Sequence, residues 1–165
     1  MPQLPGPSDG TERKLLLGWL AFHRSAIADA CAGLSDEQLS RPAAWPSTQS
    51  LHGIVRQLAQ LEQRYLVDAI RGGEGVDAGG GGGVDAAVGG HNLSGGFAPL
   101  LLPGEFAAAL QQWHDIRLRA DALLATGKLT DKCAGNGRSI RWNLLKVINE
   151  YARHAGQAAL LQARL

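Results

Sequence analysis

Positions 139–165 of this 165-residue chain read SIRWNLLKVINEYARHAGQAALLQARL, and their apolar residues recur at spacings of three and four. This spacing predicts one amphipathic helix from about Ser139 to the C-terminus. Its apolar stripe consists of Leu144, Val147, Tyr151, His154, Ala158 and Leu161. The histidine on this stripe is a candidate for chemistry, although such a residue is more often a hydrogen-bonded core residue than a catalyst.

The same periodicity occurs in three earlier segments. The first spans about residues 11–34, the second runs from near Ser50 to Gly72, and the third spans about residues 104–125. Between the first two, Ser35 and Gln38 have the spacing of a capping box, which predicts a short helical turn. No alternating stretch is long enough for a strand. Four amphipathic helices predict an all-α four-helix bundle, with tryptophans at helical spacing in its core: Trp19, Trp113 and Trp142.

The connection between the second and third helices is rich in glycine, with an unbroken run at 79–83. Such a segment buries too little apolar surface to offset its ordering entropy, so it is predicted to be disordered. Its length matches the ~30 Å of a twenty-residue helix, so these helices can run parallel. We therefore predict one domain over 1–165, with a flexible N-terminus at 1–10 and a Gly-rich crossover loop at 72–104.

Composition and charge exclude several classes of protein. A formal net charge of +1 gives no reason to expect nucleic acid or an anionic membrane as a partner. The longest apolar run, residues 15–22, is too short to span a bilayer, and residues 1–10 do not resemble a secretory signal. Cys31 and Cys133 form no CxxC motif, and Cys31 is predicted to be buried. The cytoplasm is the expected location.

Five motifs, in the expected order along the chain, resemble the DinB-like superfamily and its mycothiol-dependent branch: GLSDEQ at 33–38, PSTQSL at 46–51, GIVRQL at 53–58 followed by Glu62, Arg141 with Trp142, and EYARH at 150–154. The resemblance implies an up-down-down-up bundle. It also implies a divalent metal held by one histidine of the second helix and two of the last. Some relatives transfer a low-molecular-weight thiol to a small electrophile.

The chain departs from this family at the implied metal ligands, which fall at Gln57, His154 and Gln157. Only His154 is a histidine, and an amide oxygen is a poor ligand for zinc or nickel compared with imidazole. We therefore expect no resident metal or other cofactor. If zinc or nickel does bind, His154 needs help from other groups, for which the candidates are His23, Glu62 and His91. A thiol cosubstrate is expected if the family chemistry is retained.

The residues around His154 suggest a polar pocket between the second and last helices. Glu150 precedes His154 by four residues, so its side chain is predicted to hydrogen-bond one ring nitrogen and make His154 a general base. Both are candidate catalytic residues. The candidate substrate-binding residues are Gln57, Gln157, Lys146, Arg153, Trp45 and Tyr151. Alternatively, Lys146, Glu150 and Arg153 form only surface ion pairs, and Trp45 is a structural plug.

Three functions are compatible with this pattern. The leading prediction is an enzyme that acts on a small molecule by metal-free acid–base catalysis, in a tailoring step of specialised metabolism. The first alternative is metal-assisted transfer of a low-molecular-weight thiol, as the resemblance implies. The second is a non-catalytic protein that binds a small molecule. The partner is a small-molecule substrate in each case, and a homodimer is compatible with the family.

Overall fold

The computed structural model describes residues 6–42, 48–72 and 104–165. These residues are helical apart from turns and one isolated antiparallel bridge between Lys132 and Ser139. None of the described helices is long and apolar enough to cross a membrane. In chain order the elements are α1 (Glu12–Cys31), α2 (Asp36–Ser40), α3 (Leu51–Glu62), the π-helical segment η1 (Gln63–Asp68), α4 (Ala69–Arg71), α6 (Glu105–Thr126) and α7 (Ile140–Gln162).

Hydroxyl side chains begin the helices where the sequence predicts it. Thr11, Ser50 and Ser139 each accept a hydrogen bond from the backbone N–H three residues further on. Ser35 does the same for Gln38, whose side chain accepts in return from the Ser35 N–H, so α2 begins with the predicted capping box. Each cap stabilises its helix by about 1 kcal/mol.

Contacts at the helix starts show which helices run parallel. Glu12 and Arg141, at the beginnings of α1 and α7, form an ion pair with an Oε1–Nε distance of 2.6 Å. His52 and Phe106, at the beginnings of α3 and α6, lie with their ring centroids 6.1 Å apart. The α1–α7 pair and the α3–α6 pair are therefore each parallel.

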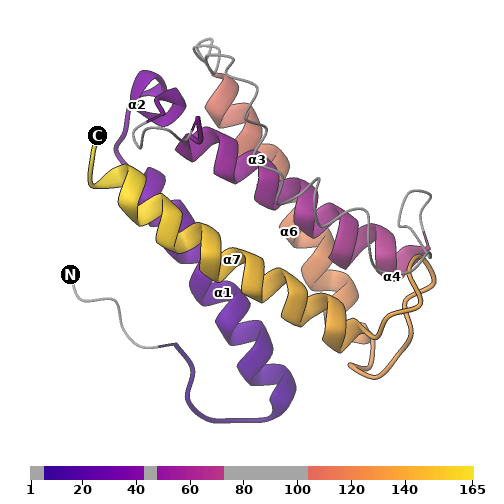
Figure 1. Ribbon diagram of the computed structural model, residues 1–165. Helices are drawn as coiled ribbons and strands as arrows, with labels where there is room; N and C mark the ends of the chain where they lie inside the picture. Colours follow the sequence, from indigo (N-terminus) through magenta and orange to yellow (C-terminus); the bar gives the residue numbers. More distant parts are fainter. Residues whose placement is uncertain (1–5, 43–47, 73–103) are drawn as a thin grey trace.

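The two pairs run in opposite directions. Early in α3, Gln57 faces His154, which lies late in α7, whereas Tyr65 in η1 lies beside Trp142 at the start of α7. Figure 1 shows α7 lying along α1 on one side and along α3 on the other. The bundle is therefore up-down-down-up, as predicted. The segment that joins the parallel helices α3 and α6, the predicted glycine-rich crossover, lies largely outside the described residues.

The core forms where the four long helices meet. Its largest fully buried side chains include Leu20, Ile54, Leu58, Leu66, Trp113, Leu144 and Tyr151. Cys31 is buried as predicted. The prediction for the tryptophans is right for Trp113 but wrong for two others, because Trp19 and Trp142 keep 37% and 41% of their surface exposed. Both lie at the edge of an apolar stripe, where helical spacing alone does not separate core from rim.

The second long helix contains a π-helical turn that was not predicted from its sequence. α3, η1 and α4 together span the predicted helix up to Gly72, whose φ of 81° ends it in a left-handed conformation. Within η1 the backbone turns are wider than in an α-helix, and such turns occur often at functional sites. Glu62 is the last residue before this turn and Asp68 is its last member.

Candidate functional site

His154 lies in the contact between α7 and α3. Its side chain is 6% exposed. The ring Nδ1 lies 2.8 Å from the backbone oxygen of Glu150, one turn earlier in the same helix. The ring Nε2 lies 3.2 Å from Oε1 of Gln57 in α3. Two of the predicted site residues therefore meet as expected, across the two helices that the sequence indicates.

The Nδ1 contact determines which nitrogen of His154 can accept a proton. A backbone carbonyl only accepts hydrogen bonds, so Nδ1 must carry a proton and donate it to Glu150. In the neutral ring, Nε2 then has the free lone pair, and Gln57 meets it with its NH₂ group. In the protonated ring, Nε2 instead donates to Gln57 Oε1, the amide atom that lies 3.2 Å from it. By rotating its amide, Gln57 can pair with both protonation states, as a proton-transferring histidine requires.

Gln57 belongs to a pair of amides at the surface. Its Oε1 also accepts a hydrogen bond of 2.9 Å from Nε2 of Gln49, which lies just before α3. Gln57 does not face the core: the residue is exposed, and only its amide reaches His154. The Nε2 nitrogen is thus covered by an exposed polar side chain at the rim of the bundle and not by the core.

Gln157 follows His154 by one turn of α7 and carries an unsatisfied atom. The residue is half-buried, and its Oε1 is buried with no hydrogen-bond partner among the described residues. A buried amide oxygen without a partner costs about 1–3 kcal/mol, so the site gains free energy from any donor that reaches it. The candidate site therefore contains a proton acceptor at His154 and an unused hydrogen-bond acceptor at Gln157.

The expected link between the Glu150 side chain and His154 is absent, and the backbone makes the contact in its place. The Glu150 carboxylate instead pairs with Lys146 Nζ at 3.2 Å and with Arg153. Burial acts to raise the pKa of Glu150, but the hydrogen bonds and charges of Arg153 and Lys146 outweigh it and lower that pKa. The three side chains form the ion-pair group of the alternative, and Glu150 contacts His154 through its backbone oxygen.

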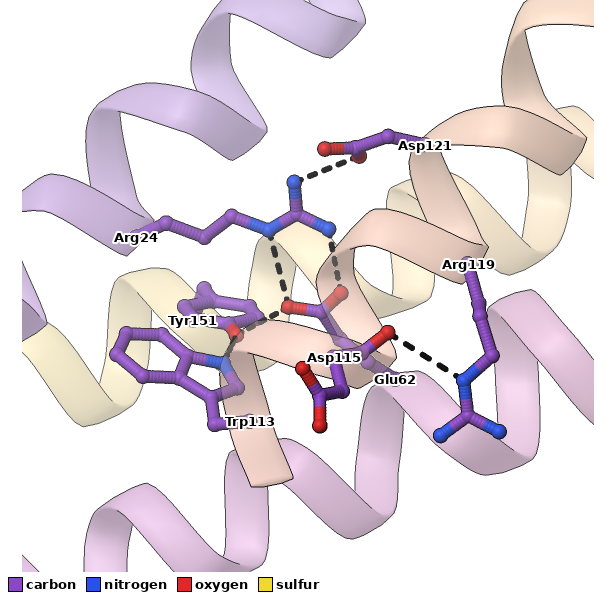
Figure 2. Close-up of polar contacts among 7 residues, drawn as sticks. All are labelled: Arg24, Glu62, Trp113, Asp115, Arg119, Asp121 and Tyr151. Carbon is purple, nitrogen blue, oxygen red and sulfur yellow. Dashed lines mark hydrogen bonds and ion pairs between the residues drawn. The ribbon is translucent and has the colours of Figure 1, made fainter. Parts of the chain in front are cut away.

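Tyr151 and Glu62 belong to a separate group, which we call the central polar cluster and which also contains Arg24 and Trp113. Figure 2 shows that these four side chains come from four different helices and converge. Arg24 Nε donates to Glu62 Oε1 at 3.0 Å, and its Nη2 pairs with Oε2 of the same carboxylate. The Tyr151 hydroxyl donates to Glu62 and accepts from Trp113 Nε1 at 2.7 Å.

The position of Tyr151 in this cluster removes it from the candidate binding surface. The side chain is 0% exposed, and its hydroxyl has partners on both sides. Burial, together with the charge of Glu62, raises the pKa of Tyr151 well above its usual value, so the phenol stays protonated. The expectation that Tyr151 contacts substrate is therefore wrong in this structure, because a substrate has no access to it.

The described residues do not fit the metal that the family resemblance implies. At the three ligand positions they supply one imidazole and two amides, and in the described ranges no group of three His, Cys, Asp or Glu side chains could hold an ion. Glu62, one of the proposed extra ligands, has both oxygens engaged by Arg24. His23, another, packs against Trp19 and Phe22 of its own helix. His91 and the predicted site residue Trp45 lie outside the described residues.

Two residues of these regions, Gln49 and Arg24, were not among the predicted site residues. Gln49 was missed because it lies in an irregular segment without periodicity. Arg24 was overlooked, although it lies four residues after Leu20 and three before Ile27 on the buried face of α1. A charged residue at such a position signals a buried partner, and Glu62 at 0% exposure is that partner.

Comparison with known proteins agrees with this geometry. Among the curated proteins, none matches the chain. A family model described as mycothiol-S-transferase matches residues 15–165, and so covers the four long helices apart from the first three residues of α1, and all described site residues. With the DinB-like order of helices and a histidine retained at one of the implied ligand positions, this match assigns the chain: it belongs to the mycothiol S-transferase family.

Proposed function

We propose that the protein transfers a low-molecular-weight thiol to a small electrophilic molecule, with His154 as a metal-free general base. The observation that carries the proposal is the Nδ1 contact with the Glu150 carbonyl, which directs the free lone pair of a neutral His154 through Nε2 toward Gln57. The family match supports the class of reaction. The setting in specialised metabolism stays a prediction.

The sulfur nucleophile is expected to come from a cosubstrate. Cys31 and Cys133, the two cysteines of the chain, are 6% and 3% exposed. Burial raises the pKa of Cys31 to about 11 and also raises that of Cys133, so neither forms a thiolate readily near neutral pH. A free thiol arriving from solvent meets the amides of Gln57 and Gln49 first, because Gln57 is exposed.

Each residue of the site then has one task. The incoming thiol displaces the Gln57 side chain, and His154 Nε2 takes the thiol proton. The thiolate sulfur forms a bond to the electrophilic carbon, the leaving group departs with its electron pair, and the proton passes from His154 to solvent. Before His154 releases this proton, Gln57 returns to accept a hydrogen bond from the protonated ring, and Gln157 Oε1 accepts a hydrogen bond from the bound thiol or electrophile.

The proposal is tested by assaying mycothiol with 1-chloro-2,4-dinitrobenzene, which loses chloride as the S-aryl product forms. We expect turnover that is unchanged by a metal chelator and falls by about 10²–10⁴-fold in His154→Ala. His154→Gln keeps the polarity but not the base, and is expected to lose as much. Lys128→Gln, at an exposed position after α6, is the control and is expected to keep the wild-type rate.

The same assay can refute the proposal in two ways. If the chelator abolishes turnover and zinc or nickel restores it, then a metal is required and the metal-free mechanism is wrong. If mycothiol binds but wild type and His154→Ala both fail to increase the rate, the protein is a binding protein without this activity. Binding of mycothiol is therefore measured by calorimetry on the same samples.

A further inference from the structure

A polar groove of about 380 Å³ lies between α3 and η1 on one side and α6 on the other. Its floor is formed by Ala59 and Ile116. The polar lining residues are Arg56, Gln60, Gln63, Arg64, Asp68, Gln112 and Arg119. Its volume is within the range of small-molecule sites.

The charge of this groove is positive and incompletely neutralised. Three arginines and one aspartate line it. Asp68 accepts a hydrogen bond of 2.6 Å from Gln63, and its single negative charge can offset at most one of the three arginines. Among the described residues, no carboxylate pairs with Arg56 or Arg119.

Arg119 is exposed, and its charge is not neutralised by a carboxylate of the described residues. Its Nε donates to the backbone oxygen of Asp115 at 3.3 Å, one turn earlier in α6. In Figure 2 this single contact joins Arg119 to its helix, and the Asp115 carboxylate points away from it. The two terminal nitrogens of Arg119 are therefore left to form a planar pair of donors, which is the geometry that binds a carboxylate or phosphate in two-point fashion.

We infer that this groove binds a small organic anion, through a carboxylate or phosphate group held by Arg119 and Arg56. The side-chain amides of Gln60 and Gln112 are placed to hydrogen-bond the polar body of the same molecule. The π-helical turn η1 contributes to the site by widening the helix where Gln63, Arg64 and Asp68 line the groove.

This site is independent of the proposed thiol transfer. Gln57 reaches α7 from one edge of α3, whereas Arg56 and Gln60 line the groove toward α6. The groove contains none of the residues assigned to the reaction. Loss of activity in His154→Ala therefore says nothing about the groove, and an anion can bind here whether or not the protein is an enzyme.

The test is isothermal titration calorimetry of the full chain with citrate and with pyrophosphate, which separate carboxylate from phosphate recognition. Triethyl citrate, an uncharged analogue, is the negative ligand. We expect one of the two anions to bind and the ester not to bind. Arg119→Gln and Arg56→Gln are each expected to weaken affinity about tenfold. Arg41→Gln, which removes an exposed arginine outside the groove, is expected to change it less than about twofold.

A fourth variant, Gln112→Glu, places a negative charge in the groove without removing an arginine. It is expected to weaken anion binding at least as much as Arg119→Gln does. The inference is overturned if neither anion binds at millimolar concentration. It is also overturned if Arg41→Gln weakens binding as much as the groove variants, because the anion is then attracted by general surface charge. Melting curves by circular dichroism identify any groove variant that does not fold. The other two groove variants then decide the test.

Discussion

Two polar groups connect α3 to α7, and they differ in how completely their hydrogen bonds are satisfied. In the central polar cluster, both Glu62 oxygens and the Tyr151 hydroxyl have protein partners, and the Glu62 and Tyr151 side chains are fully buried. In the candidate site, His154 Nε2 faces the exposed residue Gln57, and Gln157 Oε1 has no partner among the described residues.

This difference separates a structural role from a functional one. A saturated buried cluster leaves no lone pair or donor for a ligand, so its contribution is to the stability and alignment of the helices. An unsatisfied group at a rim lowers stability and gains free energy when a ligand arrives. Glu62 and Gln57 lie five residues apart in one helix of the sequence, and the structure places them in the two different groups.

The largest expected effect is on the central polar cluster. Glu62→Ala leaves Arg24 buried at 3% exposure without its main carboxylate, and Asp121 at 2.7 Å offsets only part of the loss. We expect the free energy of unfolding in urea to fall by about 3–5 kcal/mol. Arg153→Ala, which removes an exposed arginine, is the control and should cost less than about 1 kcal/mol. If the loss for Glu62→Ala is as small as the control's, the cluster does not stabilise the bundle.

Tyr151→Phe tests the same cluster by removing only the hydroxyl that joins Glu62 to Trp113. The hydroxyl donates to Glu62 and accepts from Trp113, so its removal leaves a buried donor and a buried carboxylate each short of one partner. The expected loss of unfolding free energy is about 1–3 kcal/mol, measured by the same denaturation. A variant as stable as the wild type would mean that neither contact contributes to stability.

In the candidate site, Gln157→Leu should lower ligand affinity without lowering stability, the opposite of a substitution in the central polar cluster. Leucine removes the unsatisfied oxygen and keeps a similar volume, so we expect stability unchanged or raised by up to about 1 kcal/mol. The affinity for mycothiol should fall about tenfold, because a ligand loses its acceptor. Calorimetry and urea denaturation on one sample measure both quantities. A destabilised Gln157→Leu with normal affinity would reverse the assigned roles.

The smallest effect concerns the Glu150 ion pairs and depends on pH. The folded-state pKa of Glu150 lies below its ordinary 4.5, so the pairs contribute stability above that value and lose it as pH falls through the folded-state pKa. Glu150→Gln should therefore cost about 0.5–1 kcal/mol at pH 7 and nearly nothing at strongly acidic pH. Melting temperatures of the wild type and of Glu150→Gln, taken from pH 7 down to strongly acidic pH, measure this difference. A difference independent of pH would show that the charge of Glu150 is not the cause.

The fold was predictable because its signals are local and repeated. Ser50 and Ser139 begin helices where a cap is followed by periodic apolar residues, and the family motifs supply the helix order. The site was predictable only in its His154–Gln57 contact. The partner of Nδ1 is a backbone atom of Glu150, and the residues that bury Tyr151 come from other helices, so spacing along one helix contained neither fact.

The most direct test of the contrast between the two groups is to measure kcat/KM of His154→Ala and Tyr151→Phe with mycothiol and 1-chloro-2,4-dinitrobenzene. Both substitutions lie on α7, three residues apart, and each removes contacts to α3. Our account predicts a fall of about 10²–10⁴-fold for His154→Ala and less than about threefold for folded Tyr151→Phe. Equal losses, or a larger loss for Tyr151→Phe, would contradict it.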